Sequence, residues 1–195
     1  MTRPSPSLDQ VRLRQTLVAV LDRSMPACAH VEYRLVGTGA ALLHGVELPA
    51  ADVDILVKER EGVDAFGATL ASFRCLSAPA WLPPTRQYYG NYEVSGVEVG
   101  VSTVEVDSEA DTIETFGPGP WEHFALIPCG PHTVPTVALE LRLITELYRD
   151  RPDTGLAPAT VHKCHTVLHK ALKQAVEWNL VPRNVADAVK APRPA

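Results

Sequence analysis

The stretch VGTGAALLHGVELPAADVDILV, residues 36–57, decides the fold. It ends in a pattern in which Asp52 and Asp54 alternate with apolar residues, which predicts a strand over 52–58 with one buried face. Because side chains alternate across a strand, both carboxylates point to the same side. Carboxylate oxygens, completed by water and substrate phosphates, are typical ligands of Mg²⁺. The stretch therefore predicts a magnesium site, with an ordinary solvated strand face as the alternative.

A turn of small residues precedes this strand. Gly37, Thr38 and Gly39 lead into an apolar run that predicts a short helix over 40–44. Glycine allows backbone N–H groups to come close to a ligand, and phosphate is favoured where such donors are unpaired. Thr38 adds a hydroxyl group. Taken alone, a tight turn without a ligand is about as common, so the phosphate site is predicted jointly with the two aspartates.

This order of turn, helix and Asp-x-Asp strand resembles the signature of the minimal nucleotidyltransferase superfamily, which includes DNA polymerase beta. The residues that carry the resemblance are Gly37-Thr38-Gly39-Ala40 and Asp52-Val53-Asp54. It implies an α/β fold, a small mixed sheet flanked by helices, over residues 8–153. It also implies that Asp52 and Asp54 hold Mg²⁺ and a nucleoside triphosphate, with one or two ions, and that the glycine turn contacts the phosphates.

The sequence departs from the family pattern in two places. Thr38 stands where Gly or Ser is usual, although it keeps a hydroxyl group. Many relatives also carry Arg or Lys shortly before the Asp-x-Asp pair, whereas residues 48–51 here read Leu-Pro-Ala-Ala. A missing cation leaves the triphosphate less neutralised, which counts against turnover.

A hairpin over 88–106, turning at Ser95-Gly96, should carry the third carboxylate of the family pattern. Its second arm alternates Val with other residues and places Glu98 and Gly100 on one face. The resemblance makes Glu98 the candidate general base, with Glu105 as a weaker alternative. Many relatives would carry the acid at the position of Gly100. An ordinary exposed residue of the hairpin is an equally good interpretation of Glu98.

The remaining sequence predicts further elements around these. An amphipathic helix is expected over 8–21, with Asp9 near its start. The other expected elements are a strand over 32–36, a helix over 63–73, loops over 77–85 and 118–135, and a helix over 137–149.

Composition indicates an ordinary globular protein. Of 195 residues, 46% are hydrophobic and 21% charged, and no apolar run approaches the ~20 residues of a membrane helix. The N-terminus lacks the apolar core of a signal peptide, so a cytoplasmic location without membrane contact is expected. The four cysteines show no Cys-x-x-Cys spacing and are expected to be reduced.

The charge is uneven along the chain. Residues 155–195 contain six Lys or Arg against two acids, a net charge of +4. Because the whole chain has a net charge of −5, residues 1–154 have a net charge of −9. A long helix is predicted over 158–179, with His162, His165 and His169 on its polar side. Three histidines could share a metal, but a plain polar face is the more common meaning of this pattern.

This C-terminal piece resembles part of the core-binding domain of phage integrases, or tyrosine recombinases. The resemblance rests on Thr160-Val161, 168–172, 175–178 and the stretch from Pro182-Arg183-Asn184 to Pro192-Arg193. It implies contact with the DNA backbone, and no catalytic recombinase set follows, so recombinase activity is not expected. The DNA-binding candidates are Lys163, His169, Lys170, Lys173 and Arg183.

The function predicted from the sequence is Mg²⁺-dependent transfer of a nucleoside monophosphate from a nucleoside triphosphate to a hydroxyl acceptor. A DNA-binding protein with a catalytically silent front domain is the second hypothesis. The third is an antitoxin-like protein that pairs with a helical partner protein, as small relatives of this fold often do.

Overall fold

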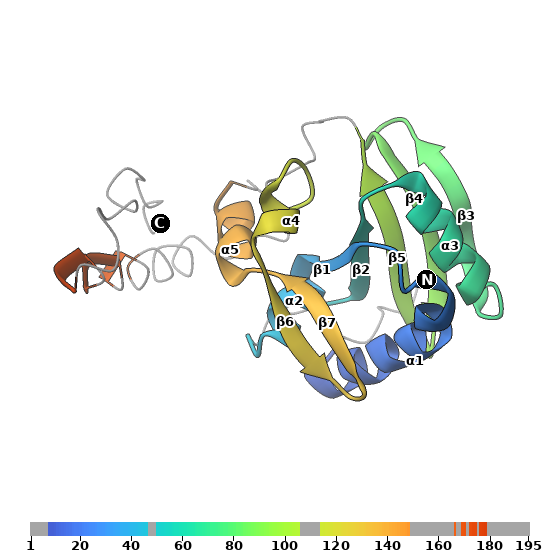
Figure 1. Ribbon diagram of the computed structural model, residues 1–195, viewed down its shortest axis with the longest axis horizontal. Coiled ribbons are helices and arrows are strands. Elements are labelled where there is room, and N and C mark those ends of the chain that lie inside the picture. Colours follow the sequence, from blue (N-terminus) through green and yellow to red (C-terminus); the bar gives the residue numbers. More distant parts are fainter. Residues whose placement is uncertain are drawn as a thin grey trace, which may run out of the picture. The chain divides into compact units, whose positions relative to one another are not determined.

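The computed structural model describes residues 8–46, 50–105 and 114–148, together with residues 166, 169–170, 172–174 and 176–178 (Figure 1). The chain divides into two compact units, residues 1–145 and 146–195, which are described separately. The boundary expected at 153–155 lies outside the described residues.

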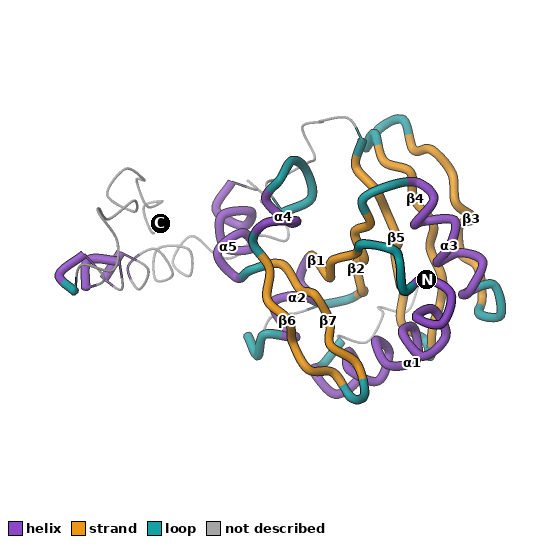
Figure 2. The backbone as a smooth tube through the Cα atoms, viewed as in Figure 1, coloured by secondary structure: helices purple, strands orange, loops and turns teal. Residues whose placement is uncertain are grey.

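Helices and strands alternate along the first part of the chain (Figure 2). The helices are α1 (Gln10–Cys28), α2 (Gly37–Leu43), α3 (Arg60–Leu70), α4 (Gly119–Glu122) and α5 (Leu139–Tyr148). The strands are β1 (Tyr33–Val36), β2 (Asp52–Val57), β3 (Arg74–Leu82), β4 (Gln87–Val94), β5 (Val97–Val104), β6 (Phe124–Cys129) and β7 (His132–Val137).

The seven strands form one mixed sheet in the order β3-β4-β5-β2-β1-β7-β6. The pairs β2–β5 and β1–β7 are parallel, and the other neighbours are antiparallel. Helix α3 packs on β4 and β5 and against α1, and the buried side chains of these elements belong to one apolar cluster. The mixed sheet flanked by helices confirms the α/β fold class expected from the sequence.

The hairpin of β4 and β5 was predicted from local chemistry, and the structure confirms it. Ser95 and Gly96 both have positive φ, 53° and 74°, which suits the two-residue turns that match the twist of a hairpin. Asp9 also behaves as expected: its carboxylate accepts a hydrogen bond of 2.7 Å from the Arg12 amide and caps α1. Helix α1 is longer than predicted and continues through Pro26 to Cys28.

Two predicted loops were wrong. The stretch 77–85 largely belongs to β3, the edge strand of the sheet, where Pro79 lies within the register shift between Ser77 and Ala80. Proline removes a donor and is tolerated at such edges and bulges, so it does not exclude a strand there. The stretch 118–135 contains α4, β6 and most of β7, because Gly130, with φ of 60°, closes a second hairpin.

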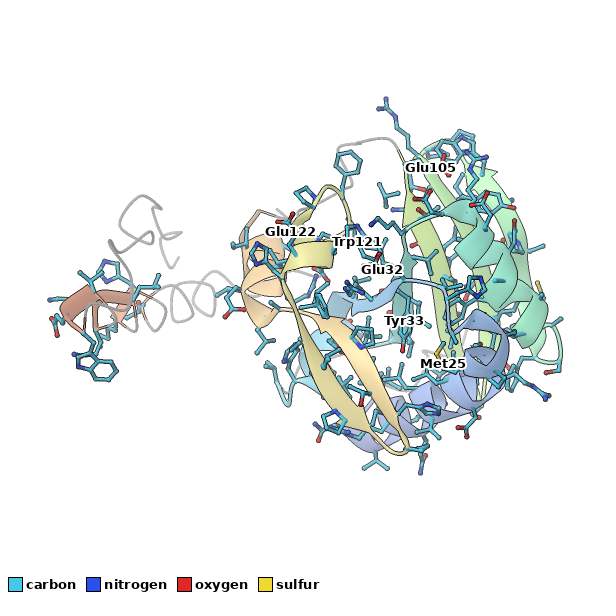
Figure 3. The ribbon with its side chains drawn as sticks, viewed as in Figure 1. Met25, Glu32, Tyr33, Glu105, Trp121 and Glu122 are labelled. Carbon is cyan, nitrogen blue, oxygen red and sulfur yellow. The ribbon has the colours of Figure 1, made fainter. Side chains whose placement is uncertain are left out.

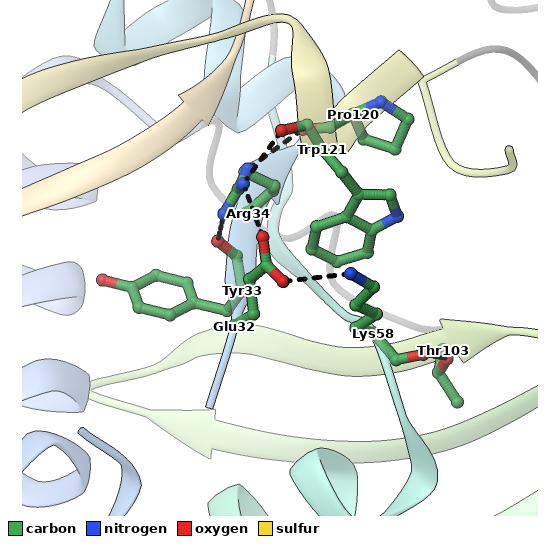
Figure 4. Close-up of polar contacts among 7 residues, drawn as sticks. All are labelled: Glu32, Tyr33, Arg34, Lys58, Thr103, Pro120 and Trp121. Carbon is green, nitrogen blue, oxygen red and sulfur yellow. Dashed lines mark hydrogen bonds and ion pairs between the residues drawn. The ribbon is translucent and has the colours of Figure 1, made fainter. Parts of the chain in front are cut away.

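Arg34 on β1 ties α4 to the sheet (Figure 4). The side chain is buried, with 5% of the residue exposed. Its guanidinium donates to the Pro120 carbonyl at 2.9 Å and forms an ion pair with Glu32 at 3.0 Å. The guanidinium also lies 3.9 Å from the centroid of the Phe124 ring. Since the guanidinium donates to backbone carbonyls and a carboxylate and also packs over an aromatic ring, this cluster has a structural role.

Cys28, Cys75 and Cys129 are free thiols, as expected, and Cys164 lies outside the described residues. Among the described helices, none is both long and apolar enough to cross a lipid bilayer.

Candidate active site

Asp52 and Asp54 lie on the same face of β2, in the middle of the sheet. Both are half-buried, whereas Val53 and Ile55 between and beyond them are buried on the other face. The alternation therefore places two carboxylates side by side, as the sequence predicted.

The glycine turn meets these acids in space. Gly37 begins α2 directly after β1, and β1 pairs with β2 so that Val36 lies opposite Asp54. Gly37 has φ of +72°, and a Cβ atom there would lie 2.6 Å from Oδ2 of Asp54. Any other residue would be strained and would displace the carboxylate, so the turn and the acid are built for close approach.

The next two residues of the turn differ in exposure. Thr38 is half-buried, whereas Gly39 is buried, and a Cβ atom on Gly39 would lie 3.4 Å from the carbonyl oxygen of Asp52. Gly39 therefore allows α2 to pack closely against β2. The predicted phosphate contacts of Gly37, Thr38 and Gly39 stay predictions.

Glu98 on β5 joins the same face. The parallel register pairs Asp52 with Glu98 and Asp54 with Gly100, so Glu98 lies beside the first aspartate. The Glu98 side chain is exposed and accepts a hydrogen bond of 3.3 Å from Nδ2 of Asn91. Gly100, the residue directly beside Asp54, has no side chain, so a side chain from the next strand can occupy that space.

That neighbour is Tyr89 on β4, which sequence reasoning missed. A Cβ atom on Gly100 would lie 3.0 Å from Cε2 of Tyr89 and 3.4 Å from Oδ1 of Asp54. Burial, followed by the charges of Asp54 and the other two acids, raises the pKa of Tyr89 to about 12. The phenol therefore stays protonated at neutral pH and offers a hydrogen-bond donor at the edge of the site.

Glu105, the weaker alternative for the third acid, is used elsewhere. It lies just beyond the end of β5 (Figure 3) and forms a two-point ion pair with Arg60, in which Nη2 and Oε2 are 2.7 Å apart. The Arg60 guanidinium lowers the pKa of Glu105. The Glu105 carboxylate is therefore ionised but already bound to Arg60, so Glu98 is the better candidate for the third acid.

A fourth acid, Glu114, contacts the turn from 77 residues away. One carboxylate oxygen accepts a hydrogen bond from the Gly37 amide, and the other lies 2.7 Å from Nη1 of Arg142 on α5. Glu114 and Arg142 are both buried. No local pattern in the sequence marks this contact, because its partners are brought together only by the fold.

The described residues contain no group of three or more His, Cys, Asp or Glu that is arranged to hold a metal ion. The fit of Mg²⁺ therefore rests on Asp52 and Asp54 alone. Two carboxylates are enough when water and substrate phosphates complete the coordination, because Mg²⁺ is usually bound in this way. The donor chemistry of the two residues fits that ion.

Ionisation of Asp52 should destabilise the folded protein. Burial, and then the nearby Glu98 carboxylate, raises the pKa of Asp52 above its ordinary value of 3.8. A raised pKa in the folded state means that stability is lost as pH rises through that pKa. We expect Asp52→Asn to melt at a higher temperature than wild type at pH 8, and the difference to shrink near pH 4. Thermal melts across pH test this, and a lower melting temperature for the variant at pH 8 would contradict it.

Only part of the predicted DNA-binding set lies within the described residues. Lys170 and Lys173 are exposed on a helical segment and His169 is half-buried, whereas Lys163 and Arg183 lie outside the described residues. The same holds for His162 and His165, so a shared histidine metal site stays untested.

Comparison with known proteins supports the fold. The chain is similar to a solved structure from Thermotoga maritima, a candidate nucleotidyltransferase, with a TM-score of 0.57 and 16% sequence identity. That match covers 86% of this chain and 97% of the other. A second solved structure, an antigenic nucleotidyltransferase-like protein from Paracoccidioides brasiliensis, has a TM-score of 0.45 and 16% identity, covering 73% of this chain and 67% of the other.

By sequence, no protein-family model and no curated protein matches the chain. The resemblance of residues 155–195 to an integrase core-binding domain therefore finds no support in these comparisons. The nucleotidyltransferase-like fold does find support, at a level of identity that concerns the fold alone.

Proposed function

We propose that this protein is a nucleotidyltransferase that moves a nucleoside monophosphate from a nucleoside triphosphate to a hydroxyl acceptor. The observation that carries the proposal is the contact between the glycine turn and the Asp-x-Asp strand. The position of a Cβ atom on Gly37 lies 2.6 Å from Oδ2 of Asp54, so a phosphate near the turn would also lie near the acids.

Each residue has a role in this proposal. Asp52 and Asp54 would hold Mg²⁺, which would neutralise the triphosphate and polarise the reacting phosphorus. The acceptor oxygen forms a bond to the α-phosphorus, and the bond from that phosphorus to the pyrophosphate oxygen breaks. The acceptor proton passes to Glu98, and pyrophosphate leaves.

Nucleotides labelled at the α-phosphate test the proposal. The purified chain is incubated with each labelled triphosphate, with and without Mg²⁺, and with an oligonucleotide that supplies a free hydroxyl. We expect label to enter the acceptor or the chain's own hydroxyl groups only when Mg²⁺ is present, and a chelator to stop the transfer. Failure to transfer any of the labelled nucleotides would remove the support for an enzyme.

Glu98→Gln separates the catalytic role of Glu98 from that of an ordinary exposed residue. General base catalysis typically contributes about 10²-fold to 10⁴-fold, so we expect a loss of that size in the transfer rate. The control is Glu93→Gln, because Glu93 lies directly across from Glu98 on β4 and pairs with Arg74 at 3.4 Å. Equal rates for the two variants would show that Glu98 is not the base.

A further inference from the structure

Glu114 and Arg142 form an ion pair inside the front unit that the proposed chemistry does not use. Their exposed fractions are 1% and 4%, and Oε2 of Glu114 lies 2.7 Å from Nη1 of Arg142. Removing two charges from water is costly, and apolar residues of similar volume often serve stability as well. Stability alone therefore does not explain why a buried ion pair is present next to Gly37, which favours a functional role.

The second oxygen of the same carboxylate points to such a role. Oε1 of Glu114 accepts the hydrogen bond of the Gly37 amide, and Gly37 lies against Asp54, a proposed metal ligand. One anionic group is thus held between a guanidinium and a backbone N–H at the edge of the candidate active site. These are the two kinds of donor that bind phosphate oxygens in proteins.

We propose that the Gly37 amide and the Arg142 guanidinium form a phosphate site for the nucleotide, which the Glu114 carboxylate occupies while no nucleotide is bound. The inference rests on the proposed function and names a residue for it. Arg142 would supply the positive charge that the sequence lacks ahead of Asp52. Arginine suits the task because its planar fork can bind two oxygens of one anion.

Glu114 and a phosphate group cannot share these donors. A triphosphate would bring further negative charge beside Asp54, and like charges at short distance repel. The carboxylate must therefore leave before the phosphate enters. The apparent affinity for nucleotide is then the intrinsic affinity multiplied by the fraction of molecules in which Glu114 has left the site. A variant that removes the charge of Glu114 and keeps its shape should bind polyphosphate more tightly.

Inorganic tripolyphosphate is the probe, because it carries the phosphates without base, sugar or added metal. We expect Glu114→Gln to bind it at least about tenfold more tightly than wild type in calorimetric titrations, a difference of about 1.4 kcal/mol. The control is Glu105→Gln, which removes an acid that is also paired with arginine but lies at the surface. The gain should disappear when Arg142→Met is added to Glu114→Gln. Equal or weaker binding by Glu114→Gln, or a gain that survives the loss of Arg142, would overturn the inference.

A measurement on the wild-type chain guards against a variant that folds poorly. The Gly37 amide should change its chemical shift when tripolyphosphate is added to ¹⁵N-labelled protein, because its hydrogen-bond partner changes. A Gly37 signal that stays in place at saturating tripolyphosphate would also overturn the inference.

The two proposals can fail separately. Tripolyphosphate titrations need no catalysis, so tight binding by Glu114→Gln without any transfer of label would end the proposed function and leave the phosphate site. Transfer of label with no effect of Glu114→Gln on tripolyphosphate binding would leave the enzyme and end the phosphate site.

Discussion

Asp52→Ala combined with Asp54→Ala should reduce Mg²⁺-dependent nucleotidyl transfer by about a thousandfold or more. The double change removes both proposed metal ligands, which lie on one face of β2 beside the glycine turn. A bound metal contributes several kcal/mol to stabilising charge in a transition state, and about 4 kcal/mol corresponds to roughly a thousandfold in rate. The rate of label transfer at saturating Mg²⁺ is the measurement.

The loss should not come from unfolding. Burial and Glu98 raise the pKa of Asp52, so its ionised form does not stabilise the fold at neutral pH. Thermal melts should therefore show a folded Asp52→Ala variant, and the same melts establish whether the double variant is folded. The matched control is Asp64→Ala, which removes an acid of α3 that accepts a hydrogen bond of 3.0 Å from the Tyr88 hydroxyl. Label transfer that survives the double change would rule out the assignment of the metal site.

The strongest sequence prediction concerned features that lie close together in the chain. The alternation of acids and apolar residues in β2 and the small residues Gly37, Thr38 and Gly39 are local patterns. The structure confirms the strand and the shared face, but it places these three small residues in the first turn of α2 rather than in a separate turn before the helix. The hairpin of β4 and β5 was also readable, because Ser95-Gly96 suits a two-residue turn. Local chemistry thus predicted the elements that present the candidate site.

Other features could not be predicted because local patterns do not determine them. Pro79 made an edge strand look like a loop, since a proline is tolerated where one side of a strand lacks a partner. The pairing of Asp52 with Glu98 depends on β2 and β5 being parallel neighbours, which only the fold decides. Tyr89 is brought to the acids in the same way, by the register of β4 on β5.

Glu114→Ala should lower the stability of the front unit about as much as the loss of a large buried side chain would. The variant leaves the buried Arg142 guanidinium without the carboxylate that lies 2.7 Å from it and removes the acceptor of the Gly37 amide. Breaking a buried pair in this way costs about 3–5 kcal/mol in the free energy of unfolding. For a chain of this size we expect a fall in melting temperature on the order of 10 °C.

The surface pair of Glu105 and Arg60 provides the comparison for this result. Glu105→Ala also removes a carboxylate from an arginine, but the exposed fractions of the two side chains are 32% and 48%. Water and salt screen such a pair, so we expect almost no change in melting temperature. Similar melting temperatures for Glu114→Ala and Glu105→Ala would contradict the view that burial makes the difference.

A double change shows whether the charges of the buried pair are needed for folding at all. Replacing both partners by apolar residues, as in Glu114→Leu with Arg142→Met, removes the two desolvated charges together. Such replacements are often neutral or stabilising, so the double variant should regain most of the stability lost by Glu114→Ala. Because it also removes the proposed phosphate site, it should bind tripolyphosphate more weakly than Glu114→Gln does. A stable fold with weak anion binding would assign these two charges to function, whereas an unstable double variant would assign them to the fold.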